Sequence, residues 1–252
     1  MTRQTEDQKR GACLIIGGAG GIGSALARLL EEDGVPIVLA GRSEAPLHKL
    51  AEEIGARARV LDATNSDDLK AVVAEEGPLT SAVNCVGSIL LKPAHLTTDD
   101  EYEYAFAQNV KTAFNLVRSA APAMRKSGGS IVLMSSCAAS AGLASHEVIA
   151  AAKAAVEGLT RAAAASYASW NVRVNAVAPG LVDTSLSAHI TKKDAALEAS
   201  RSMHPIGRIG APNDIARAIR FLLDPEADWI TGDVLHVDGG LSNLRSRATA
   251  NG

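Results

Sequence analysis

Short apolar runs alternate with longer stretches of mixed polarity along this chain of 252 residues. The runs are rich in Val, Ile and Leu and do not alternate strictly between apolar and polar positions. This pattern is typical of strands that are buried on both faces of a parallel sheet. The runs cover residues 11–16, 36–40, 58–62, 81–86, 130–135, 172–178 and 233–239.

The stretches between the runs have helical periodicity. They predict helices over residues 21–33, 44–54, 66–76, 98–126, 146–169 and 212–223. Strands that alternate with helices predict a doubly wound, seven-stranded parallel α/β sheet with helices on both faces, the Rossmann fold. No linker or repeat divides the sequence, so residues 1–252 are expected to form one domain, with flexible tails at 1–10 and 244–252.

Composition excludes several classes of function. The net charge is −3, so no basic excess points to nucleic acid or to an anionic membrane. The chain has no apolar run of about 18 residues, and residues 1–10 are too polar for a signal peptide. Cys13, Cys85 and Cys137 are scattered, which indicates neither a disulfide framework nor a metal site and favours the reducing cytoplasm.

A glycine-rich turn at residues 17–23 joins the first strand to the first helix. Glycine permits positive φ and lets backbone N–H groups approach a pyrophosphate, while the helix N-terminus adds partial positive charge. The position of this turn, directly after a strand, indicates dinucleotide binding. The alternative is a tight turn with no ligand.

The spacing in this turn is Gly-x-x-x-Gly-x-Gly, and further motifs follow it along the chain. Asp62 and Ala63 follow the third strand, Asn84-Cys85-Val86-Gly87 ends the fourth, and Asn-Ala-Val-Ala-Pro-Gly begins at residue 175. Together with segments 205–216, 230–232 and 237–240, these motifs resemble the single-domain short-chain dehydrogenase/reductase family over nearly the whole chain. Ile16 stands where that family has Thr.

The resemblance implies a nicotinamide dinucleotide site at the carboxyl edge of the sheet. Val182 (through its backbone) and the Thr184 hydroxyl are expected to hold the carboxamide, and Lys153 the ribose. The cofactor-binding residues implied are Gly17, Gly21, Ile22, Gly23, Asp62, Ala63, Asn84, Gly87, Lys153, Pro179, Gly180, Val182 and Thr184.

The end of the second strand bears on the choice of cofactor. A carboxylate there would hydrogen-bond the adenosine ribose and repel a 2′-phosphate, whereas a guanidinium would pair with that phosphate. The chain has Arg42 and Ser43 at this point. The sequence therefore predicts NADP(H), with NAD(H) as the alternative if Arg42 is only a solvated loop residue.

The catalytic residues of the family match at three positions and differ at a fourth. By resemblance, Ser136 polarises the carbonyl, Asn109 supports a water chain, and Lys153 lies four residues after a proton-donating tyrosine. That tyrosine position is Ile149 here, and the spacing from Ser136 gives the same residue. Ser136 and Asn109 have structural alternatives, since each side chain can bond local backbone.

His146 is a candidate substitute for the missing acid. It lies seven residues before Lys153, and a helix capped by Ser145 would place residues 146, 149 and 153 on one face. Histidine can donate a proton near neutral pH. The alternative is that His146 caps the helix or contacts substrate without proton transfer.

These expectations combine into one functional hypothesis. The chain is predicted to be an NADP(H)-dependent oxidoreductase that moves hydride between nicotinamide and a small carbonyl, hydroxyl or activated-alkene substrate beneath a lid at 185–204. The alternative is a non-catalytic cofactor-binding subunit or sensor that pairs with a homologous active partner. Apolar residues on several faces of helices 98–126 and 146–169 suit subunit packing, and the resemblance implies a homotetramer, or else a dimer.

Overall fold

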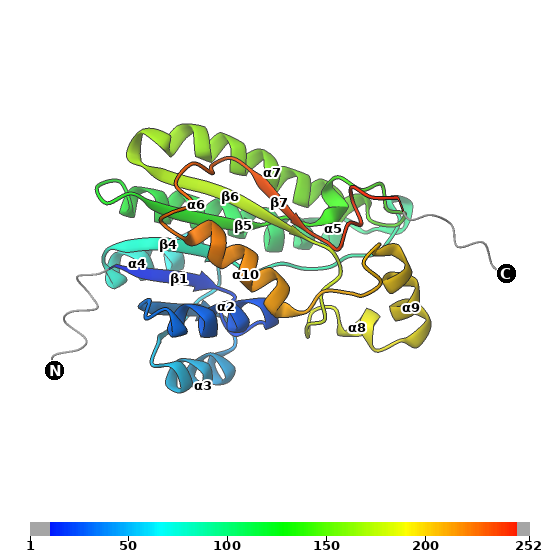
Figure 1. Ribbon diagram of the computed structural model, residues 1–252, viewed down its shortest axis with the longest axis horizontal. Coiled ribbons are helices and arrows are strands. Elements are labelled where there is room, and N and C mark those ends of the chain that lie inside the picture. The colour runs from blue at the N-terminus through cyan, green and yellow to red at the C-terminus, as the bar shows by residue number, and fades with distance from the viewer. Residues whose placement is uncertain (1–10, 246–252) are drawn as a thin grey trace.

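A computed structural model describes residues 11–245, and the predicted tails fall mostly outside this range (Figure 1). Seven parallel strands form one sheet in the order β3-β2-β1-β4-β5-β6-β7. This arrangement confirms the doubly wound parallel fold. The strands are β1 (Ala12–Ile16), β2 (Ile37–Gly41), β3 (Arg57–Val60), β4 (Leu79–Asn84), β5 (Gly129–Met134), β6 (Val172–Pro179) and β7 (Val234–Val237).

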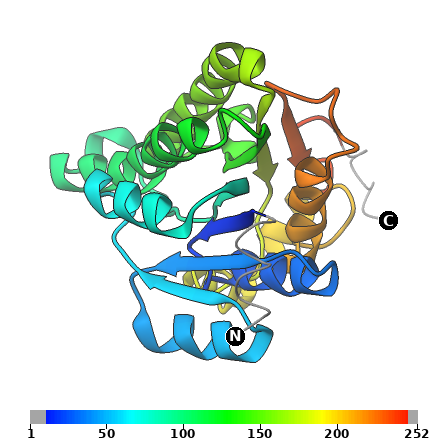
Figure 2. The same cartoon turned by 90° about the vertical axis from the view of Figure 1, so that its left-hand side faces the viewer.

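Helices cover both faces of the sheet (Figure 2). One face, which includes Leu14 and Ile131, is covered by α4 (Ser66–Glu76), α6 (Thr112–Ala123) and α7 (Glu147–Tyr167). The other face, which includes Ile15 and Val132, is covered by α2 (Gly21–Glu32), α3 (Glu44–Ile54) and α10 (Pro212–Leu223). Alternate strand residues feed the two cores, which is why the runs read as continuously apolar. Among the strands within residues 11–245, β3 and β7 at the two edges are the least buried.

The helix predicted over residues 98–126 is interrupted. A capping box between Thr98 and Glu101 starts α5 (Asp99–Phe106), a π-helical turn (Ala107–Lys111) follows, and α6 ends at Ala123. Within the wide turn the amide of Asn109 donates to the Ala105 carbonyl, a backbone acceptor four residues earlier. Such π-turns are frequent at functional sites because the extra residue redirects side chains.

The expected lid at 185–204 contains two short helices, α8 (Ala188–Thr191) and α9 (Asp194–Met203), which connect β6 to the segment before α10 (Figure 1). Within residues 11–245, no helix combines the length and apolar character needed to span a membrane.

Candidate functional site

The site lies at the carboxyl edge of the sheet, beside β1 and β4, where the strand order reverses. Open α/β sheets bind ligands at such a switch point. A cavity of about 380 Å³ opens there. Its lining includes residues from four predicted motifs, namely Gly17, Arg42, Ser43, Asp62, Ala63, Cys85, Val86 and Gly87, together with Ser185 and Leu186 of the lid.

The glycine turn leaves no room for side chains. Gly17 has φ +77°, and a Cβ on Gly23 would lie 2.4 Å from the Gly17 carbonyl oxygen. A Cβ on Gly21 would lie 2.8 Å from Cγ2 of Thr184, so the turn packs directly against the methyl group of the residue predicted to bind the carboxamide. Within residues 11–245, no side chain caps the N-terminus of α2, and its first turn has no acidic residue. Its free N–H groups therefore offer an anion site.

Asp62 also lines the cavity. Its Oδ1 accepts hydrogen bonds from Thr64 N (2.9 Å) and from the Thr64 hydroxyl (2.8 Å). The Thr64 backbone bond does most to lower the pKa of the Asp62 carboxyl, and the nearby charge of Arg42 adds to it. Arg42 itself is exposed, which leaves its guanidinium open to a ligand phosphate.

Lys153, Asn109 and Gly87 converge at the centre of the site. A Cβ on Gly87 would lie 3.0 Å from Asn109 Oδ1 and 3.5 Å from Lys153 Nζ, so both side chains approach the backbone closely at this glycine. The Lys153 side chain, 7% exposed, donates to the Met134 carbonyl oxygen at 2.8 Å. Burial lowers its pKa from 10.5 to about 8.

Asn109 is fixed by Ser88, a residue that the sequence did not single out. Asn109 Oδ1 accepts from the Ser88 N–H (3.2 Å), and its Nδ2 donates to the Ser88 hydroxyl (2.9 Å). The sequence signal that could have pointed to Ser88 is its position directly after Gly87. The two functional segments are therefore locked together by a reciprocal pair of hydrogen bonds.

Ser136 and Ile149 lie at the ends of neighbouring elements. Ser136 Oγ accepts from Ala138 N at 3.2 Å and caps the short 3-10 turn Cys137–Ala139, which is the structural alternative considered for it. Ile149 is 4% exposed on the first turn of α7, one turn before Lys153. An apolar side chain thus occupies the position at which the family's tyrosine is expected.

The helix cap predicted at Ser145 is wrong by one residue. The N-cap of α7 is His146, and Ser145 has φ +61°, a left-handed conformation that sharply turns the chain into the helix. Nδ1 of the half-buried His146 pairs with the Ala144 carbonyl oxygen at 2.8 Å. Nδ1 therefore donates, and Nε2 is left as the nitrogen that can exchange a proton with a ligand.

The turn after β6 is held by Ser187, another residue without a sequence signal. Ser187 is buried; its hydroxyl donates to Val182 O (2.5 Å) and accepts from Thr184 N (3.0 Å). Val182 also forms a parallel bridge with Gly210. These contacts set the backbone of the predicted carboxamide-binding segment.

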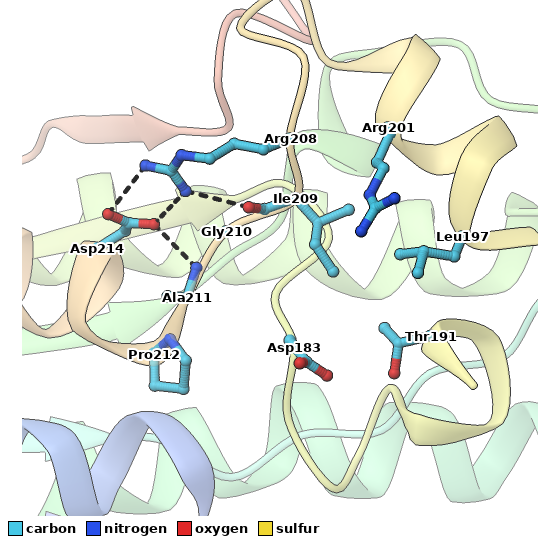
Figure 3. A pocket seen from close by; sticks show the side chains of 10 residues that line it. All are labelled: Asp183, Thr191, Leu197, Arg201, Arg208, Ile209, Gly210, Ala211, Pro212 and Asp214. Atoms are coloured by element: carbon cyan, nitrogen blue, oxygen red, sulfur yellow. Dashed lines mark hydrogen bonds and ion pairs between the residues drawn. The ribbon is translucent and has the colours of Figure 1, made fainter. Parts of the chain in front are cut away.

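A second cavity, of about 510 Å³, lies behind the lid (Figure 3). Arg201 and Leu197 reach into it from α9 and face Asp183 on the turn after β6 (Figure 3). On its far side Arg208 donates to both oxygens of Asp214, at 2.6 and 3.2 Å. This bidentate pair lowers the pKa of the Asp214 carboxyl and anchors the 205–212 segment on α10.

The three cysteines are unpaired thiols. Burial raises the pKa of Cys13 and of Cys85 to about 12 and that of Cys137 to about 11. In the part of the chain that the structure describes, His, Cys, Asp and Glu form no group of three that could hold a metal ion.

The fold and the site together define a dinucleotide-binding α/β protein, and comparisons with known proteins specify its family. A family model described as "Enoyl-(Acyl carrier protein) reductase" matches residues 17–242. Galactitol 2-dehydrogenase (L-tagatose-forming) of Cereibacter sphaeroides is 37% identical, with 95% of this chain and 98% of the relative covered. A 3-oxoacyl-(acyl-carrier-protein) reductase of Thermotoga maritima is 34% identical, with 91% and 96% covered.

A solved structure agrees with these sequence relatives. The actinorhodin polyketide ketoreductase with NADPH has a TM-score of 0.88 to this chain at 26% identity, with 94% of this chain and 99% of that one covered. The chain belongs to the short-chain dehydrogenase/reductase family. Its members are oxidoreductases that transfer hydride to or from a nicotinamide dinucleotide, either NAD(H) or NADP(H).

Proposed function

We propose that this protein is an NADP(H)-dependent oxidoreductase that acts on a small carbonyl, hydroxyl or activated-alkene substrate. The observation that carries the proposal is the convergence of Lys153, Asn109 and Gly87 beside the glycine turn. A buried ammonium with one protein hydrogen bond, to Met134 O, keeps donors for ligand hydroxyls. Gly87 itself lines the cavity, so the Lys153 ammonium lies next to the space where a ligand would bind.

The residues present fit a nicotinamide dinucleotide. The N–H groups of Gly21, Ile22 and Gly23 suit the pyrophosphate, Asp62 and Ala63 the adenine, and Asn84, Gly87 and Lys153 the ribose next to the nicotinamide. The segment Pro179, Gly180, Val182 and Thr184 suits the carboxamide. Bound there, the cofactor would supply or accept the hydride at its nicotinamide C4.

The preference for NADP(H) rests on Arg42 and Ser43. Both line the cavity and are exposed, and the second strand ends without a carboxylate. A guanidinium and a hydroxyl at this point can bind a 2′-phosphate by charge-assisted hydrogen bonds. The relatives include a ketoreductase whose structure contains NADPH, which is consistent with this choice.

The proton for a carbonyl substrate is assigned to His146. Its Nε2 is free of protein partners within residues 11–245, and the side chain lies at the start of the helix that bears Ile149 and Lys153. Ser136 would polarise the substrate oxygen, and Asn109 would support the resupply of protons. For an alkene conjugated to a carbonyl, the proton goes to carbon and solvent can supply it. Having Ile149 in place of a tyrosine then lowers the reaction rate less.

The second candidate function is a non-catalytic cofactor-binding subunit or sensor. It is favoured by one observation, the buried apolar side chain of Ile149 at the position of the family's acid. The exposed aromatic side chains of Tyr102, Tyr104 and Phe114 along α5 and α6 support assembly as a homotetramer or dimer, or pairing with a homologous active partner. The free thiols favour a cytoplasmic location.

Titration of the purified protein with NADPH and, separately, with NADH tests the proposal, with nicotinamide fluorescence as the signal. Tighter binding of NADPH, lost in Lys153→Met, supports it. Equal affinity for both nucleotides contradicts the NADP(H) preference. Binding of neither contradicts the oxidoreductase proposal and favours a subunit that works without a cofactor.

A further inference from the structure

His204 is a buried histidine at the junction of the lid and the site. It follows the last residue of α9, and 3% of it is exposed. His204 is the last residue of the expected lid at 185–204, and both of its ring nitrogens are engaged inside the protein. Nδ1 lies 2.6 Å from Ser200 O, and the Leu181 N–H donates to Nε2 at 3.2 Å.

These two contacts define the protonation state of the ring. Because the Leu181 amide is a donor, Nε2 must be an unprotonated acceptor. Because Ser200 contributes a carbonyl oxygen, Nδ1 must carry the proton and donate it. The contacts therefore require the neutral ring with hydrogen on Nδ1.

The ring connects the end of α9 to the turn after β6. Ser200 O belongs to the last turn of α9, where carbonyl groups lack partners within the helix. Leu181 belongs to the turn after β6. A Cβ on Gly180 would lie 2.4 Å from Nε2, so the close approach of the ring depends on glycine at that position.

We propose that His204 is a positioning residue, which fixes the Pro179–Thr184 turn to the end of lid helix α9. The proposal rests on the proposed function in one respect, namely that this turn holds the nicotinamide carboxamide. Its structural part, the tie between α9 and the turn, stands independently of any ligand.

The turn depends on Nε2 of His204 as a hydrogen-bond acceptor. Without it the Leu181 N–H would lose its partner on the ring, and a buried donor without a partner is costly. Asp238, whose Cα also lies near Gly180, is already committed to its own loop, because its carboxylate accepts from the Gly240 and Ser242 N–H groups.

Amide hydrogen exchange on the cofactor-free protein tests the tie. In His204→Leu, which keeps the bulk of the side chain but has no acceptor, the Leu181 amide should exchange about tenfold faster than in the parent. In His204→Gln, whose side-chain oxygen can accept the same bond, protection should be largely retained. His189→Gln, on the exposed histidine of the same lid, is the matched control and should change nothing. Unchanged Leu181 exchange in His204→Leu would overturn the proposal.

NADPH affinity is the second readout. It should fall about tenfold in His204→Leu, while His204→Gln and His189→Gln should bind NADPH nearly as the parent does. Equal NADPH affinity in the parent and in His204→Leu would overturn the role of the tie in positioning the turn. If the parent binds no nucleotide, the proposed function fails, while the exchange measurements still decide the role of His204.

Discussion

Lys153 Nζ donates a 2.8 Å hydrogen bond to the carbonyl oxygen of Met134, at the carboxyl end of β5. Main-chain oxygen is a neutral acceptor, so it compensates only part of the hydration that the ammonium loses. Burial therefore lowers the pKa of Lys153 from 10.5 to about 8. The free protein therefore holds a poorly solvated ammonium group at the point where ligand hydroxyls are expected to bind.

The lowered pKa of Lys153 predicts a specific pH dependence of folding stability. Between pH 8 and 10.5 the unfolded chain binds more protons at this lysine than the folded protein does, so its contribution to stability rises with pH. The cost of the buried charge is fully present below pH 8 and absent above 10.5, a change of about 3 kcal/mol. In Lys153→Met this increase should disappear.

Urea unfolding of both proteins at pH 7 and at pH 10 measures the effect, and the difference between the proteins cancels the other titrating groups. The exposed Lys49, replaced by Met, is the control and should behave like the parent. Identical pH dependence of stability in the parent and in Lys153→Met would show that burial does not disfavour the charged form of Lys153.

Arg42→Ala should weaken NADPH binding by about tenfold or more and leave NADH binding nearly unchanged. The physical reason is the loss of a bidentate partner for the 2′-phosphate, which NADH lacks. Fluorescence titrations with both nucleotides measure it. Lys49→Ala removes a positive charge from neighbouring α3 without touching the cavity, and a similar loss there would mean that only general electrostatics is involved.

Gly23→Ala should abolish nucleotide binding and destabilise the protein. The new Cβ would lie 2.4 Å from Gly17 O and 3.0 Å from Gly18 Cα, so the backbone of the turn must move. Gly158→Ala is the matched control: this glycine also lies in a helix, and its Cβ would meet nothing within 4 Å. It should stabilise α7 by up to about 1 kcal/mol. Thermal unfolding and NADPH titration distinguish the two variants, and normal binding by Gly23→Ala would contradict the assigned role of the turn.

Local signals made much of this architecture predictable. The strand runs and the glycine turn depend on neighbours in sequence, so their positions followed from patterning, and the requirement for glycine at Gly23 follows from the same turn. The π-turn at Ala107–Lys111 was not predicted, because it differs from an α-turn in which backbone groups pair, and the pattern of apolar residues does not report that pairing. Sequence spacing placed Lys153 correctly because one helix carries it.

Residues that act across the fold escaped prediction. Ser187 and His204 have no motif, and their roles come from contacts with backbone groups 5 and 23 residues away in sequence. The Ser145 cap was misplaced because serine is a favoured N-cap, whereas here the chain needs a left-handed residue just before the helix. The roles of these residues follow from the tertiary geometry around them and not from their local propensities.

Ile149→Tyr addresses whether the site lacks only its acid. The new hydroxyl would lie one turn before Lys153, whose positive charge favours the phenolate and so makes the tyrosine a better match for proton transfer near neutral pH. Against a panel of small ketones and aldehydes with NADPH, activity should rise by about 10²–10⁴-fold, the usual contribution of a general acid.

The matched control is Ile149→Phe, which adds the ring without the hydroxyl. A gain in Ile149→Tyr that Ile149→Phe does not share would show that Ser136, Asn109 and Lys153 are poised for catalysis. His146→Ala should remove most turnover from the parent and little from Ile149→Tyr, because the tyrosine would replace the imidazole as donor. Equal losses in both backgrounds would mean that His146 contacts substrate without giving up a proton. No gain in Ile149→Tyr, with NADPH still bound, would favour the non-catalytic subunit.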